Sequence, residues 1–76
     1  MDDKKLFSLI KKSLKINQDV NDKSSDKNIE EWDSLGHLSI LSALDKATKG
    51  KASKIKNLSD ATSVQKIKKI LKQKNL

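Results

Sequence analysis

Apolar residues recur at helical spacing in three segments of the chain, and polar stretches separate them. The segments are residues 3–16 (Leu6, Phe7, Ile10 and Leu14, with Leu9 and Ile16), residues 34–48 (Leu35, Leu38, Leu41 and Leu44, with Ile40 and Ala47) and a last segment to residue 73 (Val64, Ile67, Ile70 and Leu71). A period of three to four residues predicts amphipathic helices. The second segment is rich in leucine, so we expect its helix to be heavily buried.

Residues that start and stop helices stand at the segment ends. Asp2 and Asp3 stand at the start of the first segment, and Ser34 can cap the second. Gly50 falls just past the second helix, where glycine is favoured. The run Thr62-Ser63-Val64-Gln65 fits a capping box with Thr62 as N-cap. Residues 53–59 are expected to hold one short helical turn.

Residues 17–33 have no sustained period and contain many turn-forming Asn, Asp and Ser residues. A loop of this length in a small domain is normally held down by its own contacts. Val20, Ile29 and Trp32 are the apolar residues available for that role. We therefore interpret Trp32 as a packing residue rather than a platform for a ligand.

The composition fits one small helical domain over residues 1–76. The chain has no Pro, two Gly and no Cys, which favours helices and excludes disulfides and thiolate metal sites. A single histidine, His37, cannot build a histidine metal site alone. No apolar run approaches the roughly 18 residues of a membrane span, so we expect a cytoplasmic protein. The predicted fold is all-α: a small antiparallel four-helix bundle of three longer helices and one short one.

Charge is the strongest competing signal, because the chain carries a net +7. All 17 basic residues are Lys, and Phe7 and Trp32 are the only aromatic residues. Sequence-specific nucleic-acid contacts favour Arg forks and aromatic platforms, so no specific nucleic-acid partner is expected. Six carboxylates and two lysines nevertheless make residues 22–45 net −4, which leaves the rest of the chain at +11.

Ser34 lies in this acidic window, in the sequence Trp32-Asp33-Ser34-Leu35-Gly36-His37-Leu38. The N-terminus of a helix has unpaired N–H groups and favours an anion such as a phosphate. His37 could share the first turn with Ser34, but no Gly-x-Ser-x-Gly elbow is present. The chain is also too small to enclose a substrate cleft beside its own core. Serine hydrolase chemistry is therefore not expected, and a plain helix cap is the simplest alternative for Ser34.

The chain resembles the acyl carrier protein family. The resemblance rests on Asp33-Ser34-Leu35, on the leucine-rich segment that follows, on the long preceding loop and on the closing helix. It implies that Ser34 carries a 4′-phosphopantetheine arm, which holds acyl or aminoacyl groups as thioesters and passes them between enzymes. The implied protein is a monomeric carrier, not an enzyme. The implied partners are a phosphopantetheinyl transferase and acyl-activating, acyl-transferring or condensing enzymes.

The resemblance also assigns roles around Ser34. Asp33, Leu35, Gly36 and His37 flank the arm, and the bare Gly36 would ease the approach of an enzyme. For His37 we expect a surface residue, with contact to the phosphate or to a partner as the alternative.

The same resemblance predicts a partner-binding surface. It comprises Leu35, Glu30, Glu31 and Ile40, although core packing competes with docking, more for Ile40 than for Leu35.

The chain departs from familiar fatty-acid carriers, which are strongly acidic along the helix that follows the serine. Here that helix has Gly36, Ser39, Ser42 and Lys46, and Asp45 is its one acidic residue. We therefore expect a specialised pathway rather than bulk fatty-acid synthesis. Two alternatives stay open: a small basic module that binds nucleic acid or another anionic partner, and a helical adaptor in which Ser34 is only a cap.

Overall fold

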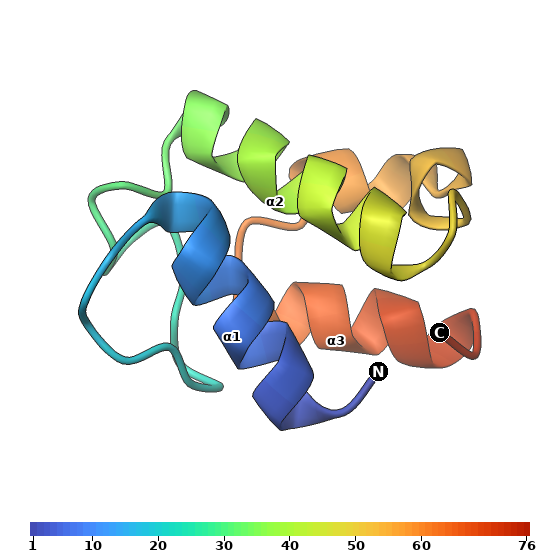
Figure 1. The fold of residues 1–76 in the computed structure, drawn as a ribbon, viewed down its shortest axis with the longest axis horizontal. Coiled ribbons are helices and arrows are strands. Elements are labelled where there is room, and N and C mark those ends of the chain that lie inside the picture. The colour runs from blue at the N-terminus through green and yellow to red at the C-terminus, as the bar shows by residue number, and fades with distance from the viewer.

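Three α-helices and no β-strand form the computed structural model, which describes residues 1–76 (Figure 1). The helices are α1 (Asp3–Leu14), α2 (Ser34–Ala47) and α3 (Val64–Gln73). Two short 3₁₀ helices, η1 (Ala52–Lys54) and η2 (Lys56–Asp60), occupy the place of the predicted short turn. The all-α class is confirmed, but a fourth α-helix is absent.

The α1 helix ends two residues earlier than predicted. Asp2 caps its start, where the carboxylate accepts a hydrogen bond from the N–H of Lys5 at 2.7 Å. Lys15 adopts the left-handed conformation, with φ 55°, and this stops the helix. The buried face follows a four-residue step: Leu6, Ile10 and Leu14.

The buried face of α2 differs from the predicted leucine stripe. Leu35 and Leu38 are 75% and 61% exposed, and Ala47 is exposed as well. A three-residue step turns about 300° around a helix, so three such steps carry the side chain to the opposite side. Leu35 and the buried Leu44 therefore face opposite ways, and the expectation of a heavily buried helix is wrong for its first turns. The inward residues are His37, Ile40 and Leu44.

The segment between α2 and α3 sets the direction of the last helix. Gly50, just past α2 as predicted, has φ 87°, and its N–H bonds to the carbonyl of Asp45 at 2.8 Å. Beyond it, η1 and η2 carry the chain back behind α2 (Figure 1). As a result α3 runs in the same general direction as α2 and α1 crosses them obliquely, which differs from an antiparallel four-helix arrangement.

The N-cap of α3 is Ser63, and the prediction of Thr62 is wrong by one residue. The Ser63 hydroxyl accepts a hydrogen bond from the N–H of Lys66 at 3.2 Å. Thr62 cannot begin the helix because its carbonyl pairs with the long loop, where it accepts the N–H of Asp26 at 3.0 Å. The helix then runs to Gln73 as predicted.

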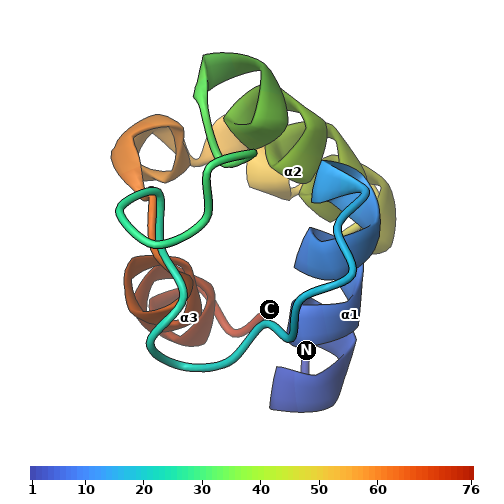
Figure 2. The same ribbon diagram turned by 90° about the vertical axis from the view of Figure 1, so that its left-hand side faces the viewer.

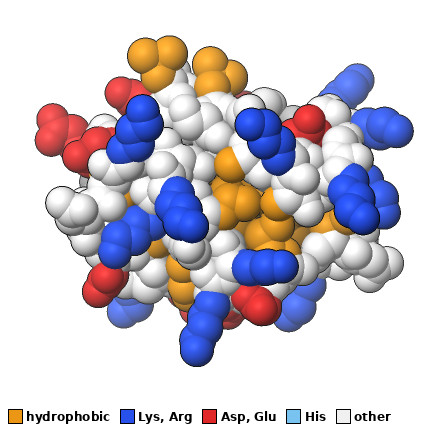
Figure 3. All heavy atoms as spheres, in the orientation of Figure 1, with side chains coloured by type: hydrophobic (Ala, Val, Ile, Leu, Met, Phe, Trp, Pro, Cys, Tyr) orange, Lys and Arg blue, Asp and Glu red, His pale blue; other side chains and the backbone are white.

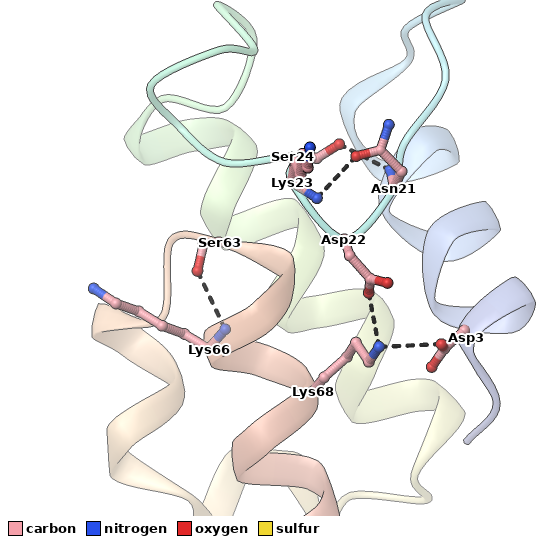
Figure 4. Close-up of polar contacts among 8 residues, drawn as sticks. All are labelled: Asp3, Asn21, Asp22, Lys23, Ser24, Ser63, Lys66 and Lys68. Atoms are coloured by element: carbon pink, nitrogen blue, oxygen red, sulfur yellow. Dashed lines mark hydrogen bonds and ion pairs between the residues drawn. The ribbon is translucent and has the colours of Figure 1, made fainter.

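The long loop crosses one end of the molecule and is held by burial and by polar contacts (Figure 2). Val20, Ile29 and Trp32 are buried, as predicted. Lys68 of α3 bridges the loop to α1: its ammonium donates to Asp22 at 2.7 Å and to Asp3 at 3.1 Å (Figure 4). Hydrogen bonding to these two carboxylates raises the pKa of Lys68 above its ordinary value.

None of these helices combines the length and the apolar character needed to cross a membrane.

The long loop shares one core with the helices, and this core is built from fifteen buried apolar residues. This shared core fixes the loop end at residues 30–33 against α2, where Ser34 begins the helix.

Candidate functional site around Ser34

Ser34 is the first residue of α2 and is exposed. The N-cap is its neighbour Asp33, whose carboxylate accepts the N–H of Gly36 at 2.8 Å. The expectation that Ser34 itself caps the helix is therefore wrong. Its hydroxyl makes no hydrogen bond within the protein, which leaves the oxygen available to a reagent from outside.

The backbone around Ser34 favours an anion. The N–H of His37 bonds to the Asp33 carbonyl at 2.8 Å, and the N–H of Gly36 is taken by the cap. The N–H groups of Ser34 and Leu35 have no partner inside the helix because they belong to its first turn. Together with the positive end of the helix dipole they can stabilise a phosphate bound to Ser34.

Acidic side chains surround this helix end, as the sequence indicated. Glu30, Glu31 and Asp33 are exposed. Figure 3 shows acidic side chains gathered at the upper left of the molecule, over the region where α2 begins. A partner that docks at Ser34 therefore meets negative charge, although the whole chain is basic.

His37 is buried, with 6% exposure, so the expectation of a surface residue is wrong. Its Nδ1 lies 3.0 Å from Nε1 of Trp32, and its Nε2 lies 2.9 Å from the carbonyl oxygen of Leu58. The indole can only donate and the carbonyl can only accept, so in this arrangement Nδ1 of His37 accepts a hydrogen bond and Nε2 donates one. Contact with a phosphate at Ser34 would require breaking one of these bonds.

Gly36 faces inward, so its role differs from the one we expected. A Cβ atom on this residue would overlap the carbonyl oxygen of Glu31 and lie 2.7 Å from Cδ2 of Leu14. The missing side chain thus lets the loop end and α1 approach α2. Easier access for an enzyme is not what this glycine provides.

Two leucines form an exposed apolar pair, and only one of them was predicted to belong to the partner-binding surface. Leu35 is exposed, which its predicted docking role requires although the leucine stripe predicted burial, and Leu38 lies one turn further along the same side of α2. Ile40 is fully buried, at 0% exposure, and the prediction that it contacts partners is wrong. The three-residue spacing of the leucines in the sequence could have shown the exposure of Leu35 and Leu38, because each such step turns about 300° around the helix and places these two on a different side from Leu44.

The structure therefore divides the predicted site residues into two groups. Ser34 and Leu35 point outward beside the exposed carboxylates, whereas Gly36 and His37 belong to the interior. Both nitrogens of His37 are engaged away from Ser34, so this histidine does not act as a base for its hydroxyl.

Known proteins give no further guide to this site. No protein-family model, curated protein or solved structure matches the chain. The chemistry of Ser34 and its surroundings therefore carries the functional assignment.

Proposed function

We propose that the chain is a carrier protein in which Ser34 holds a 4′-phosphopantetheine arm. The observation that carries this proposal is the free, exposed hydroxyl of Ser34 at the first turn of a 14-residue helix. Because Asp33 supplies the cap, the helix does not need the serine oxygen. The alternative in which Ser34 serves only as a helix cap thus loses its support. The helix end favours a negatively charged group, such as the phosphate of an attached arm.

Residues of this chain have binding and positioning roles in the proposed attachment. The N–H groups of Ser34 and Leu35 would stabilise the negative charge of a phosphodiester on Ser34, and Asp33 fixes the geometry of the turn by accepting the N–H of Gly36. A transferase would supply the base and the metal ion, because no side chain of this protein forms a hydrogen bond with the Ser34 hydroxyl. The bound arm supplies a thiol that carries acyl or aminoacyl groups, and the chain has no Cys that could compete for them.

The proposed docking surface for partner enzymes combines apolar and acidic groups. Leu35 and Leu38 provide the apolar contact, and Glu30 and Glu31 provide negative charge beside it. Since Asp45 is the one acidic residue along α2 itself, partners of a specialised acyl pathway fit this surface better than those of bulk fatty-acid synthesis.

A mass measurement tests the attachment. The protein is incubated with coenzyme A and a broad-specificity phosphopantetheinyl transferase, and its intact mass is recorded. We expect one added arm in the natural protein, none in Ser34→Ala and one in Ser39→Ala, where a second exposed serine of α2 is removed. Failure to gain an arm under conditions that load a control carrier would contradict the proposal.

Charge reversal tests the docking surface. In Glu30→Lys/Glu31→Lys we expect slower loading by the transferase and a weaker dependence of the rate on salt, because exposed charges act mainly on association. Lys23→Glu/Lys27→Glu changes charge in the same loop and serves as the comparison. Unchanged loading and unchanged salt dependence in the Glu-to-Lys variant would remove the acidic residues from the docking surface.

A further inference from the structure

An open groove lies between α1 and the far end of α2, with a volume of about 680 Å³. Four of its ten lining residues are apolar, among them Leu9 of α1 and Ala47 of α2. Ala47 ends the helix that Ser34 begins, so the length of α2, about 20 Å, separates the groove from the serine. The groove is thus distinct from the Ser34 site.

Lysines frame this groove on both sides. Lys5 and Lys12 stand two helical turns apart on α1, and Lys49 and Lys51 lie on the turn that follows α2. No side-chain carboxylate lines the groove, and the Met1 ammonium at its edge is already paired, because it donates a hydrogen bond to an oxygen of Leu76 at 2.7 Å. The ion pairs of the structure involve Lys11 and Lys68 only, so the four positive charges around the groove have no partner within the protein.

Figure 3 shows apolar and lysine side chains side by side on this face of the molecule. An apolar patch is visible near the middle of this face, with Lys side chains around it. In Figure 1 the same region lies where α1, the end of α2 and the two termini meet.

The apolar floor of the groove and the lysines around it together indicate which class of ligand fits. Inorganic anions and the phosphates of nucleic acid would satisfy the lysines but leave the apolar floor in water. A neutral hydrocarbon would cover the floor but leave four positive charges unpaired. A molecule with a hydrocarbon chain and one anionic head satisfies both, and the groove volume is in the usual range for small-molecule sites, about 300–1,000 Å³.

We propose that this groove binds a single-chain amphiphile with an anionic head group. The chain lies on the floor beside Leu9 and Ala47, and the head lies among the lysines. The hydroxyl of Ser8, also in the lining, makes no hydrogen bond within the protein and can donate to the head group. This proposal is independent of any group on Ser34.

An NMR titration of the unmodified full chain with sodium dodecanoate tests the proposal. We expect saturable amide shifts in α1 and in residues 47–51. Decanoate should bind roughly tenfold more weakly, because each buried CH₂ contributes about 0.8 kcal/mol. Dodecyltrimethylammonium has the same chain with a cationic head and should not bind there. Dodecyl phosphate, run in parallel, shows whether a carboxylate or a phosphate head binds more tightly.

Charge variants separate the groove from the general basicity of the chain. Lys5→Glu/Lys51→Glu changes one lysine on each side of the groove and should weaken dodecanoate binding about tenfold. Lys23→Glu/Lys27→Glu alters the net charge equally, at exposed loop residues outside the groove, and should leave binding within about twofold. Equal weakening by both variants, equal binding of the cationic amphiphile, or shifts confined to other regions would each overturn the proposal.

Discussion

At the residue scale, four consecutive residues at the start of α2 have separate tasks. Ser34 and Leu35 are exposed, Gly36 allows close packing, and the ring of His37 bonds to Trp32 and to the carbonyl of Leu58. The helix start therefore presents one reactive group, the Ser34 hydroxyl, on a support that the interior holds in place. Variants at single positions separate these tasks.

Removal of the cap and removal of the serine should have different effects on stability. Asp33→Ala deletes the acceptor of the Gly36 N–H and should lower the free energy of unfolding by about 1 kcal/mol. Ser34→Ala deletes a hydroxyl without a partner and should stay within about 0.5 kcal/mol of the natural protein. Urea denaturation followed by circular dichroism measures both, and a larger loss for Ser34→Ala would show that the serine is the cap.

Gly36→Ala should raise the free energy of unfolding if helix propensity dominates, and lower it if close packing at this residue dominates. Alanine in a helix is ordinarily favoured over glycine by about 1 kcal/mol. Here the new Cβ would collide with the carbonyl of Glu31 and with Leu14, so we expect a loss of about 1–3 kcal/mol instead. Ser39→Ala, on the exposed side of α2, provides the matched substitution without a collision. A stabilised Gly36→Ala variant would mean that α1 and the loop end can move away.

At the scale of elements, local patterns were enough to predict α1 and α3 but not the orientation of α2. In α1, Leu6, Ile10 and Leu14 follow a four-residue step, so sequence and structure agree on the buried face. In α2 the leucines follow a three-residue step that winds around the helix, and its true inward face includes a histidine.

The roles of His37 and Gly36 could not be predicted locally because they depend on partners from other elements. Leu58 in η2 accepts the bond from the histidine, and Leu14 in α1 fills the space beside the glycine. The free hydroxyl of Ser34 depends likewise on which neighbour caps the helix. In α3 the N-cap is Ser63 rather than the predicted Thr62. A shift of one residue at the start of α2 likewise decides whether the Ser34 hydroxyl is free.

The contact between His37 and Trp32 couples the loop end to α2 and should be measurable as an interaction energy. His37→Phe leaves the indole N–H of Trp32 and the carbonyl of Leu58 without partners, at an expected cost of about 1–3 kcal/mol. Trp32→Phe removes the same indole bond from the other side. A double-mutant cycle by urea denaturation should give a coupling of about 0.5–3 kcal/mol, as expected for residues in contact. Additive effects would show that the two residues stabilise the fold independently.

At the scale of the whole molecule, charge is separated along the chain. The carboxylates of residues 22–45 include those beside Ser34, whereas unpaired lysines surround the groove at the far end of α2. The two proposed sites therefore favour partners of opposite charge, and variants at one end should leave the other unaffected. Lys68 is an exception to the unpaired lysines, because it joins α1, the long loop and α3 through two carboxylates.

This three-element contact gives a pH-dependent prediction. The pKa of Lys68 is raised in the folded protein, so the contribution of its ion pairs is complete below the ordinary lysine value of about 10.4 and is lost as the pH rises through the higher folded value. We expect Lys68→Met to lower Tm at neutral pH, and the difference from the natural protein to shrink as the pH rises beyond the ordinary lysine pKa. It should also shrink at high salt, because the pairs are partly exposed.

Lys69→Met is the matched control, since Lys69 is the next residue of α3, is exposed and forms no ion pair. Thermal unfolding followed by circular dichroism at neutral and at alkaline pH measures the two variants side by side. If both variants lower Tm equally, the effect comes from net charge or helix propensity. Only a loss specific to Lys68, present at neutral pH and absent at alkaline pH, assigns the stability to its bonds with Asp3 and Asp22, and thus to the connection between α1, the loop and α3.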